Sequence, residues 1–198
     1  MPRAKQRTPE LREQLLTAAV GLLARDGVAG FTARTIANQA GTSTPALYEL
    51  FGDKAGLVRA VYFEGFRLLR AHLDEVPRTT DPRADLEAVM HAYREWMLDN
   101  RELAEIMFAR PFTDFDPGPE ELKRSAALRV FIVDLVQRCV DAGVVRGDAT
   151  DIAHVVVALV QGMAAAEAAR RLGGTTESVD RRWALALNSV LNGLAPAG

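Results

Sequence analysis

The sequence has a single cysteine, Cys139, among 198 residues, so no disulfide can form within the chain. Disulfides are typical of oxidising compartments, and their absence fits a reducing one. There is no run of eighteen consecutive apolar residues, and therefore no sequence signal for a membrane-spanning helix. The basic stretch 1–10 lacks the apolar segment of a secretory signal. We expect a cytoplasmic protein without a membrane partner.

Motifs that carry catalysis or bind cofactors are also missing. The chain has no phosphate-binding glycine loop, no zinc-ligand spacing and no nucleophile elbow. Its three histidines lie far apart, and a pair such as Asp151 and His154 is common on helices, whereas a metal site in a helix bundle needs several carboxylates besides. We expect no enzyme, no metal and no cofactor. An all-α enzyme that acts on a small molecule stays open as an alternative. A protein that contains metal and does not bind DNA would favour this alternative.

Alternating strand patterns and internal repeats are absent as well, and helical periodicity fills the chain. With 48% hydrophobic residues, the sequence predicts an all-α fold with one or two helical cores. About nine helices are expected, near residues 10–25, 32–41, 43–51, 53–76, 86–97, 102–109, 120–142, 150–171 and 177–194. The segment 76–83 holds two prolines and is the best domain boundary, so we expect domains at 1–75 and 76–198. The segment 109–120, with three prolines, is expected to be a loop.

The second and third expected helices are unusually short. Thr32 and Ser43 are good N-caps for them, and Gly41 is placed to end the first of the two. Helices of this length are marginal alone, so packing must hold them. Two helices joined by a glycine-containing turn are the helix-turn-helix arrangement, whose second helix enters the DNA major groove. This pattern predicts a recognition helix at about 43–51.

The residues around the expected recognition helix can contact a polyanion such as DNA. Pro45 and Ala46 are small, Thr44 offers a hydroxyl to a base edge or phosphate, and Tyr48 offers one to a phosphate. Lys54 stands near the first position of the fourth helix, where a cation is mildly unfavourable unless an anion binds there. Residues 1–60 carry eight Lys and Arg against five Asp and Glu, whereas the rest of the chain is acidic. The sequence thus points to a DNA-binding N-terminal part.

Residues 8–68 resemble the N-terminal domain of the tetracycline-repressor (TetR) family of bacterial transcription regulators. The positions that carry the resemblance are Ala18, Ala19, Leu22, Leu23, Gly27, Phe31, Thr32, Ile36, Ala37, Ala40, Gly41, Ser43, Leu47, Tyr48, Phe51, Lys54 and Leu57. The resemblance implies a homodimer that binds a palindromic operator and is released by a small-molecule effector, most often as a repressor. It places Thr32, Tyr48 and Lys54 on phosphates and Arg34, Thr44, Pro45 and Ala46 near the bases, and Ser43 is expected among the DNA-binding residues.

Two features leave the DNA contacts open in part. The family often has a polar residue or histidine just before the phenylalanine of the recognition helix, whereas this chain has Glu49 and Leu50. The Glu49 carboxylate either accepts a hydrogen bond from the N4 amine of a cytosine, or is repelled by phosphate and faces solvent. Arg3, Lys5 and Arg7 form either an arm for the minor groove or a solvated tail.

The C-terminal part is expected to dimerise and to bind the effector. The resemblance implies a four-helix dimer interface, with an intrachain core as the alternative; its residues would be Val156, Leu159, Val160, Met163, Trp183, Leu187, Val190 and Leu191. Bulky residues form either core or an apolar effector pocket, lined by Tyr93, Trp96, Met97, Phe108, Phe112 and Phe131 with Gln161 as a polar group. A helical adaptor that binds protein through residues 44–48 is the remaining alternative.

Overall fold

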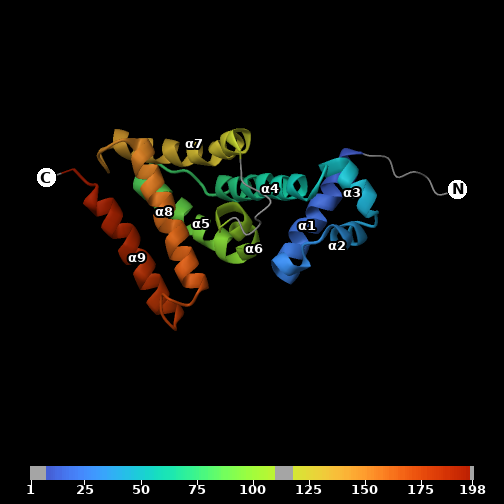
Figure 1. Cartoon of the computed structure of the whole chain (residues 1–198). Coiled ribbons are helices and arrows are strands. Elements are labelled where there is room, and N and C mark those ends of the chain that lie inside the picture. Colours follow the sequence, from blue (N-terminus) through green and yellow to red (C-terminus); the bar gives the residue numbers. More distant parts are fainter. Residues whose placement is uncertain (1–7, 110–117, 197–198) are drawn as a thin grey trace. The chain divides into compact units, whose positions relative to one another are not determined.

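The computed structural model describes residues 8–109 and 118–196, and this part of the chain is helical without a strand (Figure 1). The all-α prediction is therefore confirmed. In chain order the helices are α1 (Pro9–Gly30), α2 (Ala33–Gln39), α3 (Thr44–Phe51), α4 (Lys54–Asp74), α5 (Pro82–Asp99), α6 (Arg101–Ala104), η1 (Glu105–Ala109), α7 (Pro119–Asp141), α8 (Ala149–Ala168) and α9 (Thr176–Gly193).

Most helix boundaries lie within a few residues of the expected ones. Helix α1 continues to Gly30, beyond the expected end near residue 25, although Gly27 interrupts it with a φ of 64°. The expected sixth helix is an α-helical turn that continues as the π-helix η1. A π-helix closes its hydrogen bonds one residue later than an α-helix, and side-chain periodicity over eight residues cannot distinguish the two.

The chain divides into two compact units. Unit 1 comprises residues 1–68 and 100–124, and unit 2 comprises residues 69–99 and 125–198. The expected domains at 1–75 and 76–198 remain a functional prediction, but the compact units do not follow that division. The reason is that α6 packs on α1, so a segment from the C-terminal half of the sequence belongs to unit 1.

The core of unit 1 holds α2 and α3 against α1. Leu15 and Leu23 of α1 are fully buried, as are Ile36 of α2 and Leu47 of α3. Burial of each such side chain contributes about 1.5–3 kcal/mol, which two helices of seven and eight residues need in order to be stable. The guanidinium of Arg12 also lies over the ring of Phe51, 5.2 Å from its centroid, and ties the end of α3 to α1.

Unit 2 is built around α8, which packs between α5 and α9. Tyr93 of α5 and Trp183 of α9 are fully buried. Within the described residues, α8 alone is long and apolar enough to span a membrane, but only by length and composition. Of that apolar window 33% is buried, and a single helix of this kind is weak evidence for a membrane span.

Candidate nucleic-acid interface

Side-chain caps define where α2 and α3 begin. The hydroxyl of Thr32 accepts the Thr35 N–H at 3.2 Å, and the Thr35 hydroxyl accepts the Thr32 N–H at 3.2 Å, which completes a capping box. The hydroxyl of Ser43 accepts the Ala46 N–H at 3.3 Å. Gly41 adopts a φ of 63° in the turn between the helices, a conformation that glycine reaches without a steric penalty. The predicted caps and turn are therefore confirmed.

Helix α3 has one buried face and one open face. Leu47 is fully buried and Phe51 is 8% exposed, so this stripe holds α3 in the core. On the other side, Pro45 is exposed and Tyr48 is 38% exposed. The small residues near the N-terminus of α3 leave its first turn accessible, which is what a helix needs to approach base edges closely.

The turn from α3 to α4 is tight and fixes the position of Lys54. Gly52 has a φ of 82°, and the Asp53 carboxylate accepts the Gly56 N–H at 2.7 Å. A Cβ at Gly56 would overlap the carbonyl oxygen of Phe51, so the two helices approach as closely as their backbones allow. Lys54 is consequently the first residue of α4 and is exposed.

All eight predicted DNA-contacting residues lie in unit 1, on α2, α3, their caps and the start of α4. Thr44 and Ala46 are partly exposed, and the others are exposed: Thr32, Arg34, Ser43, Pro45, Tyr48 and Lys54. Glu49 is exposed as well. The geometry leaves each of them accessible, and contact with DNA stays a prediction. Arg3, Lys5 and Arg7 lie outside the described residues.

The predicted effector residues do not form one cluster within a single unit. Tyr93, Trp96, Met97, Phe131 and Gln161 belong to unit 2, Phe108 belongs to unit 1, and Phe112 lies outside the described residues. Gln161 donates a hydrogen bond to the Tyr93 hydroxyl at 2.9 Å, so two of the named side chains do meet. Burial raises the pKa of Tyr93 well above its usual range, and this phenol stays neutral.

Phe131 has a role that the sequence did not indicate. The guanidiniums of Arg70 and Arg78 lie 4.2 Å and 5.3 Å from its ring centroid, and Arg78 also bonds Asp134 at 2.9 Å. The two guanidiniums and the aromatic ring form a cation–π cluster, which joins α7 to the segment 70–78. Sequence periodicity identified Phe131 as buried but gave no signal for these long-range cations.

The predicted dimer residues divide according to burial. Five of them are at most 5% exposed and form the core of unit 2: Val156, Val160, Trp183, Leu187 and Leu191. Leu159, Met163 and Val190 are partly exposed. The intrachain core that the sequence left open therefore accounts for five of the eight side chains, which are covered by their own subunit. Two apolar side chains on the same helices are exposed, Val155 at 52% and Leu185 at 68%. Neither of them was named from the sequence as a candidate interface residue.

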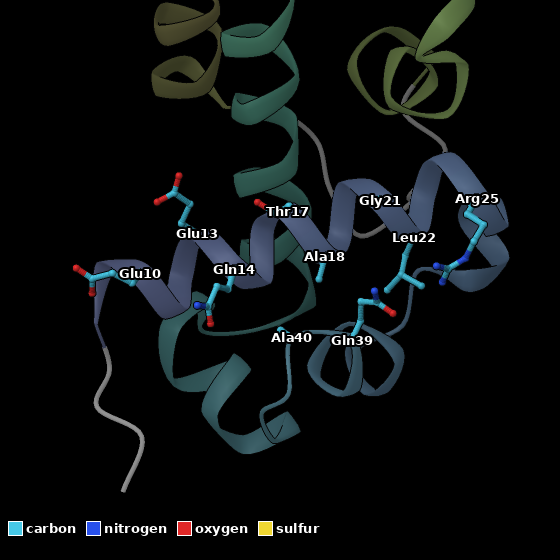
Figure 2. Close-up of a pocket in the computed structure, with 10 residues that line it drawn as sticks. All are labelled: Glu10, Glu13, Gln14, Thr17, Ala18, Gly21, Leu22, Arg25, Gln39 and Ala40. Carbon is cyan, nitrogen blue, oxygen red and sulfur yellow. The ribbon is translucent and has the colours of Figure 1, made fainter. Parts of the chain in front are cut away.

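A groove of about 690 Å³ runs along α1 in unit 1, as Figure 2 shows. Its walls are polar and apolar residues of α1, with Gln39 of α2 and the adjoining Ala40 along one edge. Glu10 and Glu13 lie toward the start of α1 and Arg25 toward its end. The groove holds none of the predicted DNA-contacting residues. Among the described residues, no group of three His, Cys, Asp or Glu side chains is placed to hold a metal ion.

Two protein-family models match the chain, one in its N-terminal part and one in its C-terminal part. Residues 15–61 match the family model described as bacterial regulatory proteins of the tetR family. Residues 86–190 match the model described as the tetracyclin repressor-like C-terminal domain. The first match contains α2, α3 and the start of α4, and the second contains α8 and most of α5 and α9.

The chain is also similar to individual proteins, two of which are described as transcriptional regulators. The chain is 36% identical over 84 residues to an HTH-type nicotine-responsive transcriptional repressor of Paenarthrobacter nicotinovorans, and this match spans 42% of each protein. A solved structure of a protein with unknown function from Rhodococcus sp. RHA1 covers 99% of the chain at 30% identity, with all of that protein matched and a TM-score of 0.81. A putative TetR-family transcriptional regulator from Rhodococcus sp. shares the fold, with 21% identity, a TM-score of 0.70, and 96% and 100% of the two chains covered.

A capped helix-turn-helix with an exposed recognition helix, followed by an all-helical C-terminal part, defines the class of DNA-binding transcriptional regulators. Within this class, the chain belongs to the tetracycline-repressor (TetR) family. It is accordingly a transcriptional regulator rather than an enzyme.

Proposed function

We propose that the protein represses transcription in the cytoplasm by binding a palindromic operator as a homodimer, and that a small, mainly apolar effector releases it. The observation that carries this proposal is the geometry of α3 and α4. A recognition helix with an accessible first turn is followed, across a two-residue turn, by Lys54 at the N-terminus of α4. A phosphate at this point meets both the ammonium group and the partial positive charge of the helix end.

The roles of the individual residues follow from their exposure. Lys54, Tyr48 and Thr32 are exposed around α3 and would contact phosphates, which fix the register of the protein on the duplex. Arg34, Ser43, Thr44, Pro45 and Ala46 would lie near base edges and read the operator sequence. The Thr32 hydroxyl already forms the α2 cap, so a phosphate there would bind beside an ordered helix end.

A second copy of the chain would cover the open face of α8 and α9. On α8, Val155, Ala158, Gly162 and Ala165 are exposed and recur at intervals of three and four residues, so they lie along one stripe. Leu185 of α9 is 68% exposed. Small residues on this stripe permit close helix approach, and two recognition helices must lie about 34–36 Å apart to read two half-sites. The dimer would thus use the outer faces of α8 and α9, and their inner faces would hold the core.

The effector would bind within unit 2, near the Tyr93–Gln161 pair. Trp96 is 5% exposed and Met97 is partly exposed on the same helix as Tyr93, so an apolar molecule would meet aromatic and thioether surfaces. A neutral phenol and a carboxamide supply polar groups without a net charge. This composition favours an uncharged or weakly polar effector over an anion.

The operator contacts are tested by Lys54→Gln. We expect the variant to bind DNA from upstream of its own gene more weakly than the wild type, with a smaller dependence on salt. Loss of one phosphate contact per subunit lowers the slope of log affinity against log salt by about 1.8 in a dimer. Electrophoretic mobility shifts at several salt concentrations measure this slope. Arg129→Gln, an exposed change on α7, is the control; equal slopes for all three proteins contradict the assignment of Lys54.

A further inference from the structure

A pocket of about 650 Å³ lies at the turn that joins α8 to α9, the turn that Figure 1 shows between the orange and the red helix. The pocket belongs to unit 2. Three arginines line it, Arg94 of α5 and Arg170 and Arg171 after the end of α8, together with one carboxylate, that of Glu167. None of the residues that we place around the effector lines this pocket, so it is a separate feature of the unit.

The carboxylates at this pocket already have partners. Glu167 accepts hydrogen bonds from the guanidinium of Arg94 and from the indole N–H of Trp183. Asp180 also accepts a hydrogen bond from Arg94, at 3.0 Å. Two carboxylates therefore bond one guanidinium, and the two arginines after α8 bring two further positive charges to the pocket.

Arg182 of α9 adds another positive charge beside the turn. Its Nη1 atom donates to the carbonyl oxygens of Leu172 at 2.8 Å and Ser178 at 2.9 Å, neither of which carries a charge. The acid in the first turn of α9, Glu177, pairs with Arg181 at 2.9 Å. Positive charge therefore exceeds negative charge around the pocket, and a concave site lined mainly by one sign of charge concentrates ligands of the opposite sign.

Arg170 has a backbone conformation that is unfavourable for an arginine. Its φ is 57°, and in the described part of the chain it is the only residue other than glycine with a positive φ. Its N–H donates to the Glu167 carbonyl oxygen at 2.8 Å, at the end of α8, where glycine is the usual residue. The side chain is exposed, so packing does not explain it. A local rule broken without a gain in packing indicates a function for the side chain.

We propose that this pocket binds a small molecule through a carboxylate or phosphate group, held by Arg170 and Arg171 together with Arg94. A guanidinium presents a planar fork of N–H donors that matches the oxygens of either group. A volume of about 650 Å³ is typical of sites for whole small molecules, so the ligand is larger than a single ion. The site goes beyond the proposed function, because it would take an anion and is separate from the apolar effector site.

Titration of the full chain with citrate and, separately, with pyrophosphate tests the site. Tryptophan fluorescence follows binding, because Arg94 lies over the Trp183 ring. Isothermal titration calorimetry measures the same affinity without a spectroscopic signal. Sodium chloride at matched ionic strength is the blank, since it screens charges but offers no carboxylate or phosphate oxygens. We expect saturable binding of at least one of the two probes and none in the blank.

Two variants assign the binding to the arginines after α8. Arg170→Gly removes a guanidinium and suits the left-handed backbone, so its Tm should stay close to that of the wild type. Arg171→Gln removes the second guanidinium. Each should weaken binding at least about tenfold, because a hydrogen bond between charged groups is lost. Arg146→Gln, an exposed change in unit 2 outside the pocket, should bind within about twofold of the wild type.

The two probes also separate the two sources of an oxyanion. Saturation by pyrophosphate alone supports a phosphate ligand, saturation by citrate alone supports a carboxylate ligand, and saturation by both supports their shared chemistry. If neither probe saturates the wild type, the proposal is overturned. It is also overturned if Arg170→Gly and Arg171→Gln bind the probes as tightly as Arg146→Gln does. None of these results depends on operator binding, because the titrations contain no DNA.

Discussion

Units 1 and 2 both have local side-chain caps, such as Asp148 and Thr175 in unit 2, but they differ in their long-range ion pairs. In unit 1, caps at Thr8, Thr32, Ser43 and Asp53 each bond a backbone N–H three residues ahead. In unit 2, Arg94 bonds Glu167 across 73 residues of sequence, and Arg138 bonds Asp85 across 53. The starts of the DNA-binding helices are thus fixed by local caps, whereas unit 2 adds to its caps ion pairs between residues far apart in the sequence.

A charged cluster around Glu167 joins distant parts of unit 2. Its carboxylate accepts hydrogen bonds from Arg94 at 2.7 and 2.8 Å and from the Trp183 indole N–H at 2.6 Å. Arg94 also lies over the Trp183 ring, 4.9 Å from its centroid, and bonds Asp180 at 3.0 Å. Helices α5, α8 and α9 are thereby joined through one guanidinium whose side chain is only 14% exposed.

Glu167→Ala should produce the largest loss of stability. It leaves the Arg94 guanidinium with Asp180 alone and a buried indole N–H unsatisfied. Removal of one member of a fully buried pair costs about 3–5 kcal/mol, and this partly buried pair should approach that range from below. Glu177→Ala is the control, because its ion pair with Arg181 is exposed and such pairs contribute about 0–1 kcal/mol.

Urea denaturation followed by tryptophan fluorescence measures the effect on unit 2, since both tryptophans, Trp96 and Trp183, belong to it. Equal losses for Glu167→Ala and Glu177→Ala would contradict the special role of the long-range cluster. The comparison between the units would then lose its main support.

Ser43→Ala should have a smaller and local effect. Loss of the N-cap of α3 costs about 1 kcal/mol, because the Ala46 N–H loses its acceptor. Hydrogen exchange should quicken in α3 while the tryptophan-monitored denaturation of unit 2 stays the same. Ser43→Thr keeps a hydroxyl at the cap and should exchange like the wild type. A change that spreads to the amides of α8 and α9 would show that the caps of unit 1 are not local determinants.

This difference in range also explains which features the sequence could predict. The caps Thr32 and Ser43, the turn at Gly41 and the buried stripe of Leu47 and Phe51 follow from neighbours within a few residues, and all are confirmed. The position of Lys54 at the start of α4 was predictable for the same reason.

Features that depend on distant partners could not be predicted in this way. Helical periodicity marked Trp183 and Leu187 as apolar, but not whether their own subunit or a second one covers them. The π-helical turn at 105–109 and the attachment of residues 100–124 to unit 1 depend on packing against α1 and α4. No local pattern records such contacts, so the effector residues named from the sequence were divided between the two units.

The cluster at Asp85 gives unit 2 a dependence on acid that the hydroxyl caps Thr32 and Ser43 of unit 1 do not share. Asp85 is 2% exposed and accepts hydrogen bonds from the Thr79 hydroxyl at 2.7 Å, the Thr79 N–H at 2.9 Å and Arg138 at 2.7 Å. The Thr79 hydroxyl bond, together with Arg138, holds the pKa of Asp85 below its usual value despite burial. Because the folded-state pKa is the lower one, the carboxylate stabilises the fold above its unfolded pKa of about 3.9, and this stabilisation is lost as the pH falls through the folded-state value.

The smallest predicted effect is therefore confined to acid conditions. Between pH 6 and pH 3, the free energy of unfolding reported by tryptophan fluorescence should fall less steeply in Asp85→Asn than in the wild type, because asparagine does not titrate. Asp134→Asn, whose carboxylate is 58% exposed beside Arg78, should retain the wild-type slope. Parallel profiles for the wild type and Asp85→Asn would mean that this carboxylate binds protons equally in the folded and unfolded chains. In that case the long-range bonds of unit 2 would position α5 and α7 without contributing to its pH dependence.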